Sequence, residues 1–440
     1  MKLVKMSLLA ATLIISTAMA AEESTYEGPT GINFTGDAKL FYSTNDSMDP
    51  GYNNDKDAAL FRKENSAGQA AVGLGLDANL TQNVQAGAHL TALTSLGLYN
   101  NVVANVWEGT PEDEFWFDQV WLAGTVGNTL GKIGRMELDT PLVFSEKWSI
   151  AANTFEAALL VNTDIPGTTV YGAYIGQSNG SGTKSGYAGV TNDFNNSKNT
   201  NFESFYGGAY AVGAVNNSWE PLTVQAWYYQ AQHLLTAYWA EANLQMSGIE
   251  VGAQFTGANY KASGINTYIN PTPAFTEDSS NTAFAAKLGY SMEKKFSVSG
   301  AFSQTGKDDK NGLGAGANLD GYGQSKLYTE AWWNYGYITA NDTTSFNLTA
   351  TTAEELTWAQ LGLYATQATS KDAIFVTSSG KNVDNVMNEI TLEAAKAFGP
   401  LNVGIYYILT NSTGDNVKAG EDEDKGQASN TVQAYLTYNF

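Results

Sequence analysis

The chain has 440 residues, of which only 15% are charged, compared with roughly 25% in an ordinary soluble domain. It contains no cysteine, two histidines (His89 and His233) and a formal net charge of -21. These counts exclude a disulfide framework, a thiol nucleophile and any thiolate or three-histidine zinc site. The acidic balance also argues against nucleic acid as a partner, because phosphate binding needs a basic surface.

Residues 1–20 predict a cleaved secretory signal peptide. Lys2 and Lys5 precede an apolar and small-residue run, and Ala18-Met19-Ala20 fits a cleavage site. The run is shorter than the roughly 18–20 residues that a membrane-spanning helix needs. Residues 21–440 would then form the mature domain. No later segment has eighteen consecutive apolar residues, which excludes a helical inner-membrane protein.

After residue 30 the main signal is period-2 alternation of apolar and polar residues. In one example, Ile390, Leu392 and Ala394 share one face, and Glu389, Thr391 and Glu393 share the other. Segments of this kind are typical of a transmembrane antiparallel β-barrel, which is the all-β fold that we expect. Sixteen strands remain compatible with the pattern, but eighteen segments match it: 31–42, 67–80, 83–99, 114–126, 129–137, 155–163, 168–177, 203–215, 221–231, 234–245, 249–258, 281–291, 295–305, 326–338, 356–369, 385–397, 400–411 and 428–440.

The connections alternate between short turns and long polar loops, as in barrels with short periplasmic turns and long external loops. Two connections depart from this rule: 232–233 is short where a long loop is due, and 339–355 is long where a short turn is due. The last segment alternates up to Phe440, which resembles the assembly signal of bacterial outer-membrane proteins. A barrel of sixteen to eighteen strands with Gln, Asn, Thr, Glu and Lys inside leaves an aqueous lumen.

No enzyme site is evident. Neither His89 nor His233 belongs to a recognisable catalytic motif, so structural roles are favoured for both. We expect no cofactor. The remaining metal candidate is a divalent-cation site formed by Glu421, Asp422, Glu423 and Asp424, although a solvated acidic loop is the favoured interpretation of this run.

The third long loop, 138–154, is the strongest candidate for a pore constriction, because a constriction needs charges near its narrow point. The charged residues that cluster in and around it are Arg135, Glu137, Asp139, Glu146, Lys147 and Glu156. Lys132 and Arg135 cannot both face the lumen in one unbroken strand register, and we expect Arg135 to face inward. For several of these residues the alternative is a salt bridge that only braces the loop against the wall.

The stretch around this loop resembles the OprD-type porins and the related major outer-membrane porins of epsilonproteobacteria. The matching residues are Gly134, Glu137, Thr140-Pro141, Asn153-Thr154-Phe155 and Ala157, together with the start Met-Lys-Leu-Val-Lys and the alternation to Phe440. The resemblance implies an eighteen-stranded pore whose third loop folds inward. One feature departs from it: OprD-type pores guide carboxylates along a ladder of arginines, whereas this chain has only Arg62 and Arg135.

We therefore expect an outer-membrane porin for passive diffusion of small hydrophilic solutes and ions. The acidic balance favours mild cation selectivity. The alternatives are a solute-specific OprD-type channel and an outer-membrane barrel with mainly an adhesin or structural role. Expected partners are outer-membrane lipid, lipopolysaccharide and the permeating solutes, with a homotrimer as the favoured assembly.

Overall fold

The computed structural model describes residues 31–46, 59–147, 150–180, 201–268, 275–320, 323–371, 384–412 and 427–440. The predicted signal peptide and the acidic run 421–424 lie outside these residues. Within the described residues the chain is almost entirely β-structure. The strands are β1 (Ile32–Asn45), β2 (Ser66–Thr81), β3 (Val84–Thr94), β4 (Glu114–Val126), β5 (Thr129–Met136), β6 (Phe155–Asn162), β7 (Thr168–Ser178), β8 (Glu203–Trp219), β9 (Leu222–Ala231), β10 (Leu235–Met246), β11 (Ile249–Tyr260), β12 (Ser279–Met292), β13 (Phe296–Thr305), β14 (Thr343–Thr352), β15 (Gln360–Ser370), β16 (Asn385–Phe398), β17 (Leu401–Ser412) and β18 (Gln427–Asn439).

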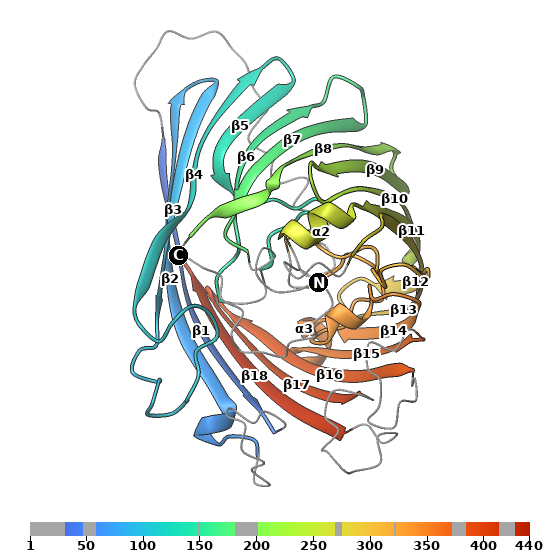
Figure 1. The fold of residues 1–440 in the computed structure, drawn as a ribbon. Coiled ribbons are helices and arrows are strands. Elements are labelled where there is room, and N and C mark those ends of the chain that lie inside the picture. Colours follow the sequence, from blue (N-terminus) through green and yellow to red (C-terminus); the bar gives the residue numbers. More distant parts are fainter. Residues whose placement is uncertain are drawn as a thin grey trace.

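These strands form a single closed antiparallel barrel (Figure 1). Each strand pairs with its neighbours in sequence, and β1 pairs with both β2 and β18. The backbone of Phe440 exchanges two hydrogen bonds with Gly36, of 2.8 and 2.9 Å, beyond the end of β18. Closure leaves no unpaired sheet edge, which is the condition for a sheet to cross a lipid bilayer. The predicted eighteen-stranded barrel is confirmed.

The alternation seen in the sequence separates the two faces of the wall. In β16, Ile390 and Leu392 are 44% and 48% exposed on the outer face, whereas Glu389 and Glu393 are 2% and 4% exposed on the inner face. The same apolar outer face continues around the barrel, for example at Phe346 of β14. A bilayer-facing exterior and a polar interior follow from this arrangement.

One of the predicted strands is wrong. Residues 326–338 are not a strand but part of a long loop inside the barrel, ending in a short 3-10 helix, η3 (Tyr335–Tyr337). The fourteenth strand is instead Thr343–Thr352, within the segment that the sequence pattern assigns to a connection. Several backbone N–H groups of 326–338 bond to side chains of the wall, for example Tyr328 to Gln254, instead of to a neighbouring strand. Alternation alone does not reveal where backbone hydrogen bonds go.

The position of β14 makes one of the two irregular connections regular. With β14 in its place, the turn 353–359 is short and holds the single-turn helix α3 (Glu354–Thr357), and the long loop is 306–342. The other departure is real, since only residues 232–234 join β9 to β10. The helix α2 (Ala262–Tyr268) covers that turn, with Gly264 packed against the backbone of His233. A second 3-10 helix, η1 (Lys63–Asn65), precedes β2. No helix in the described ranges is long and apolar enough to span a membrane.

Candidate functional site

The described parts of two long loops fold into the barrel: L3 (residues 137–154) and L7 (residues 306–342). L3 turns back on itself, since Ser145 N donates to Leu138 O at 2.7 Å. Its apolar side chains Leu138, Leu142 and Val143 are buried and belong to the same hydrophobic cluster as residues of the inner wall. Leu142 N also donates to the hydroxyl of Tyr229 on β9, at 3.4 Å. L3 is therefore folded inward and fixed to the wall, away from the lipid-facing surface.

L7 is bound directly to L3. Leu319 N donates to Leu142 O at 2.8 Å, and the side chain of Asn318 bonds to both the N–H and the carbonyl of Phe144. Asn153 of L3 donates to the carboxylate of Asp320 in L7. These contacts join loops that lie far apart in the sequence. Two loops therefore lie against each other inside the barrel, whereas the sequence predicts one inward-folded loop.

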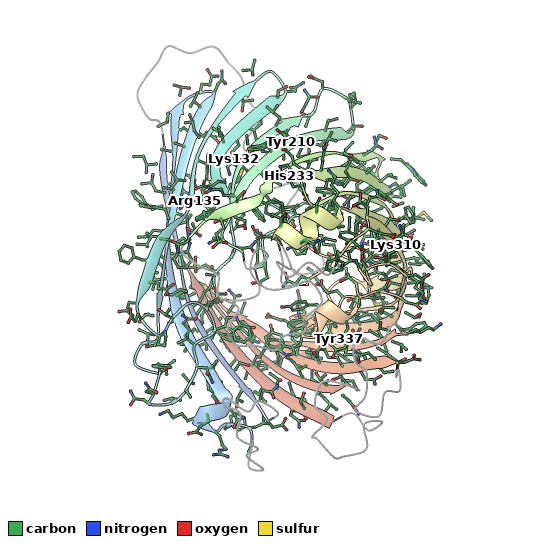
Figure 2. The ribbon with its side chains drawn as sticks, viewed as in Figure 1. Lys132, Arg135, Tyr210, His233, Lys310 and Tyr337 are labelled. Carbon is green, nitrogen blue, oxygen red and sulfur yellow. The ribbon has the colours of Figure 1, made fainter. Side chains whose placement is uncertain are left out.

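L7 continues along the opposite part of the wall, where it is held by carboxylates. The backbone N–H groups of Trp332, Trp333 and Asn334 all donate to Glu389 of β16, at 2.7 to 3.2 Å. Asn334 adds a side-chain bond of 2.7 Å to the same carboxylate. Earlier in L7, the Tyr328 hydroxyl donates to Glu241 of β10. In Figure 2, Tyr337 of L7 lies inside the ring of strands.

Four of the predicted site residues meet in the L3 region. Glu137 pairs with Lys147 at 2.5 Å, and Asp139 pairs with Lys326 of L7. Glu146 is 3% exposed, and its backbone N–H donates to Asn153. Burial lowers the pKa of Lys147, but the charge and hydrogen bond of Glu137 together with the charge of Asp139 outweigh this, so that the pKa is raised overall. The first pair lies within L3 and the second joins L3 to L7, and together they place charges of both signs inside the barrel.

The other two predicted site residues form an ion pair on the outer face. Arg135 and Glu156 lie across β5 and β6 and bond at 2.7 Å. Arg135 alternates with the buried Met136 and shares the face of Ile133, which is 62% exposed on the lipid side. The expected inward position of Arg135 is therefore wrong. Its neighbour Lys132, opposite the buried Leu159 of β6, faces inward instead, with its ammonium 4.0 Å from the ring centre of Trp121.

Sequence reasoning missed Lys326 and the carboxylates of the L7 wall. The sequence pattern places Lys326 in a strand, and nothing in its local sequence indicates that it pairs with Asp139, which precedes it by 187 positions. The inner face also holds His89, whose Nδ1 lies 2.7 Å from Asp118 and whose Nε2 lies 3.8 Å from Asp37. Strand alternation identifies the wall residues among them as inward-facing, but it gives neither their partners nor the position of Lys326, which lies in a loop.

The inner-wall carboxylates around L7 are only partly balanced by cations. Lys287 pairs with Glu250 at 2.6 Å. Glu241, Glu389 and Glu393 accept hydrogen bonds from neutral donors, and none of them forms an ion pair among the described residues. The lining therefore has an excess of negative charge on this side.

No group of three or more His, Asp or Glu side chains in the described ranges could hold a metal ion. The acidic run from Glu421 to Asp424 falls outside those ranges, so the predicted cation site stays a prediction.

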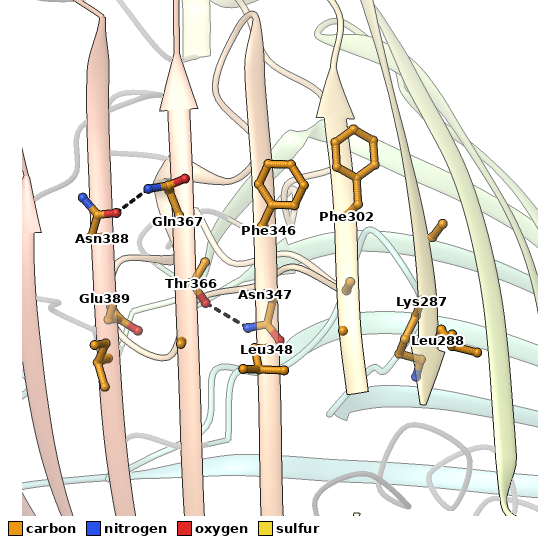
Figure 3. A pocket seen from close by; sticks show the side chains of 15 residues that line it. Lys287, Leu288, Phe302, Phe346, Asn347, Leu348, Thr366, Gln367, Asn388 and Glu389 are labelled. Atoms are coloured by element: carbon orange, nitrogen blue, oxygen red, sulfur yellow. Dashed lines mark hydrogen bonds between the residues drawn. The ribbon is translucent and has the colours of Figure 1, made fainter. Parts of the chain in front are cut away.

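A shallow apolar groove lies on the outer face of β12–β16 (Figure 3). Its outward side chains include Phe302 and Phe346, which lie side by side, and the exposed Leu348. A hydrogen bond between Gln367 and Asn388 borders it. Because these side chains share the lipid-facing side of the wall, the groove is separate from the lumen.

No protein-family model and no curated protein matches the chain. Solved structures match it in fold. OccK8 (OprE) of Pseudomonas aeruginosa is 13% identical, with a TM-score of 0.65 over 93% of this chain and 98% of that one. OccAB1 of Acinetobacter baumannii is also 13% identical, with a TM-score of 0.65 over 93% and 96%. A BenF-like porin of Pseudomonas fluorescens Pf-5 is 12% identical, with a TM-score of 0.66 over 93% and 98%. At these identities the likeness establishes the barrel fold alone.

Proposed function

We propose that the chain forms a porin of the bacterial outer membrane, through which small hydrophilic solutes and ions diffuse passively. The observation that carries this proposal is the combination of a closed ring of eighteen strands, an apolar exterior and a polar interior into which L3 and L7 fold. A ring of this strand number is wide enough for an aqueous passage. The shared fold with a BenF-like porin supports the proposal. The protein acts without catalysis and without a cofactor.

The passage is mildly cation-selective and is narrowest where L3 meets L7. Carboxylates facing the lumen raise the local concentration of cations. Lysines in the same region are largely neutralised, as the pairs of Lys147 with Glu137 and of Lys326 with Asp139 illustrate. The barrel sits among outer-membrane lipid and lipopolysaccharide, with three copies as the favoured assembly.

The test is single-channel conductance in a planar bilayer, together with the reversal potential under a KCl gradient. We expect discrete open-channel steps and a reversal potential on the side of cation selectivity. Folded barrel that inserts but conducts no current would contradict the porin proposal and leave an adhesive or structural role.

A second candidate is a solute-specific channel of the same architecture. It is favoured by one feature of the lining, a group of stacked aromatic rings around Glu393.

A further inference from the structure

A cluster of three aromatic rings lines the lumen beside L7. Trp332 of L7 stacks on Tyr406 of β17, with ring centres 4.8 Å apart and an interplanar angle of 27°. Its ring centre also lies 4.9 Å from that of Tyr364 on β15. All three side chains are only partly buried. The cluster therefore presents aromatic surface to the solute passage.

A carboxylate lies behind these rings. Glu393 of β16 is 4% exposed and accepts hydrogen bonds from the hydroxyls of Tyr364, at 2.6 Å, and Tyr406, at 3.4 Å. The Gln360 amide adds a third bond of 3.2 Å. All three donors are neutral, and no lysine, arginine or histidine of the described residues forms an ion pair with Glu393. A buried carboxylate without a cation is costly, so the site favours a positive charge nearby.

The wall is shaped to hold this arrangement. A methyl group added at Gly362 would come within 2.6 Å of Glu393 Oε2, and one at Gly404 within 2.8 Å of the Tyr406 hydroxyl. Both positions therefore need glycine for the carboxylate and the ring to occupy their places. On the same inner face, Thr391 is fully buried, and its hydroxyl has no hydrogen-bond partner among the described residues. The Thr391 hydroxyl is therefore a buried polar group, on the same inner face as Glu393, whose hydrogen-bonding capacity is unused among the described residues.

The comparison with Glu241 shows what distinguishes the cluster. Glu241 also accepts bonds from neutral donors, including the Tyr328 hydroxyl. There, however, the ammonium of Lys287 lies 4.6 Å from the ring centre of Tyr328, so a resident cation already occupies the aromatic face. No cation of the described residues lies over the rings of Trp332, Tyr364 or Tyr406. The Glu393 cluster has the same carboxylate and aromatic elements without the lysine.

We propose that Trp332, Tyr364, Tyr406 and Glu393 form a binding site for an organic ammonium ion passing through the lumen. The inference rests on the proposed porin function and specifies a solute class for it. Aromatic faces attract a weakly hydrated ammonium group through cation–π interactions, and the carboxylate behind the rings adds a charge of the required sign. A small inorganic cation prefers direct oxygen ligands and gains less from the rings.

The test uses tetraethylammonium chloride as the probe, added to single channels conducting KCl. We expect a saturable reduction of the KCl current at concentrations that leave the bilayer intact. Glu393→Gln keeps the side-chain size and an oxygen acceptor for the tyrosine hydroxyls but removes the charge. It should weaken the apparent affinity about tenfold, as expected for the loss of about 1.4 kcal/mol of attraction. Trp332→Ala should weaken it similarly, because it removes one aromatic face, and it should leave L7 in place, because Trp332 bonds to Glu389 through its backbone N–H.

The matched control is Glu293→Gln, which removes one carboxylate from an exposed turn outside the lumen. It should leave the affinity for tetraethylammonium unchanged. Retained heat-modifiable migration in gels establishes that each variant is folded. Channels that conduct KCl but show no saturable effect of tetraethylammonium would overturn the inference and leave the porin function standing, whereas absence of any KCl current would overturn the porin function itself. Block by glucose that depends on Trp332 but not on Glu393 would replace the ammonium site by a sugar site.

Discussion

Glu330 in L7 is a carboxyl whose ionisation is opposed by its surroundings. Burial raises its pKa to about 8, although the N–H of Ser325, at 2.8 Å, and the charge of Lys326 act in the opposite direction. In the unfolded chain a glutamate titrates near pH 4.3. Between these two values the folded protein keeps a proton that the unfolded chain has released, so the free energy of unfolding falls as the pH rises through this window.

Glu330→Gln removes this pH dependence. We expect the variant and the parent protein to unfold at similar urea concentrations at pH 5. At pH 9 the variant should be more stable, by about 1–2 kcal/mol after allowance for the partial exposure of the side chain. Urea unfolding followed by tryptophan fluorescence across pH 5–9 measures this difference. Parallel pH profiles for the two proteins would show that Glu330 is already ionised at pH 7.

Arg135 and Asp139 lie close in sequence but differ in the side of the wall that they face. Asp139 neutralises Lys326 beside the passage, whereas Arg135 pairs with Glu156 on the outer face. We therefore expect Asp139→Asn to leave an unpaired lysine in the lumen and to move the KCl reversal potential toward anion selectivity. Arg135→Gln should leave the reversal potential unchanged. A larger shift for Arg135→Gln than for Asp139→Asn would place the arginine in the passage after all.

At the scale of the element, period-2 alternation found seventeen of the strands, because a lipid-facing and a lumen-facing side chain must alternate along each strand. The exception shows the limit of the signal. In 326–338, Leu327 and Ala331 are buried against other loops and the wall, which produces the same alternation without a neighbouring strand. The true strand, Thr343–Thr352, is rich in threonine and reads as polar, although threonine is a good β-former.

The pair of loops inside the barrel could be predicted only in part from the sequence. L3 carries its charges in one short stretch, so the sequence pointed to Glu137, Asp139, Glu146 and Lys147. The contribution of L7 depends on contacts between residues more than one hundred positions apart, such as Asn318 with Phe144. Such pairings have no local signature.

Glu389 is the anchor of L7 on the wall, since it accepts bonds from three consecutive backbone N–H groups and one amide. Each hydrogen bond to a charged acceptor contributes about 1.5–3 kcal/mol. Glu389→Ala should therefore release L7 and raise the single-channel conductance, with more frequent transitions between levels. Glu220→Ala, in an exposed turn, is the control and should leave the current traces unchanged. An unaltered conductance for Glu389→Ala would mean that the contacts of L7 with L3 hold it alone.

Gly134 is the position where β5 is least tolerant of a side chain. Its φ is +128°, and a methyl group there would lie 2.2 Å from the carbonyl oxygen of Val120 on β4. Gly134→Ala should lower the free energy of unfolding by about 2–4 kcal/mol, as measured by urea unfolding. Gly172→Ala on β7 is the matched control, because a methyl group there meets no atom within 4 Å. Equal stabilities for the two variants would show that β4 and β5 can separate locally at no cost.

At the scale of the whole molecule, the barrel has two kinds of inner wall. Near L3 the lysines are paired with carboxylates, as in Glu137 with Lys147. Near the middle of L7 the carboxylates of Glu389 and Glu393 have only neutral partners. The excess negative charge therefore lies on the L7 side of the interior. Because the surrounding wall has a low dielectric constant, this charge is less screened than charge on exposed loops.

Closure of the ring depends on the seam between β1 and β18, which joins the two ends of the sheet from Asp37 opposite Asn439 to Asn45 opposite Thr431. Just beyond this register, the ring of Phe440 lies over Gly36, and a methyl group there would come within 2.4 Å of the ring and 3.0 Å of the carbonyl oxygen of Gly73. Gly36→Val therefore displaces Phe440 and weakens the seam. Because this seam joins the first strand to the last, weakening it opens the ring.

We expect Gly36→Val to lower the temperature at which the folded gel form converts to the unfolded form, by an amount corresponding to about 1–3 kcal/mol. Gly172→Val, which places the same side chain in open space on β7, should convert at the parent temperature. If both variants behaved like the parent protein, the seam would tolerate displacement of Phe440, and the nine residue pairs from Asp37 to Asn45 would be sufficient to close the barrel.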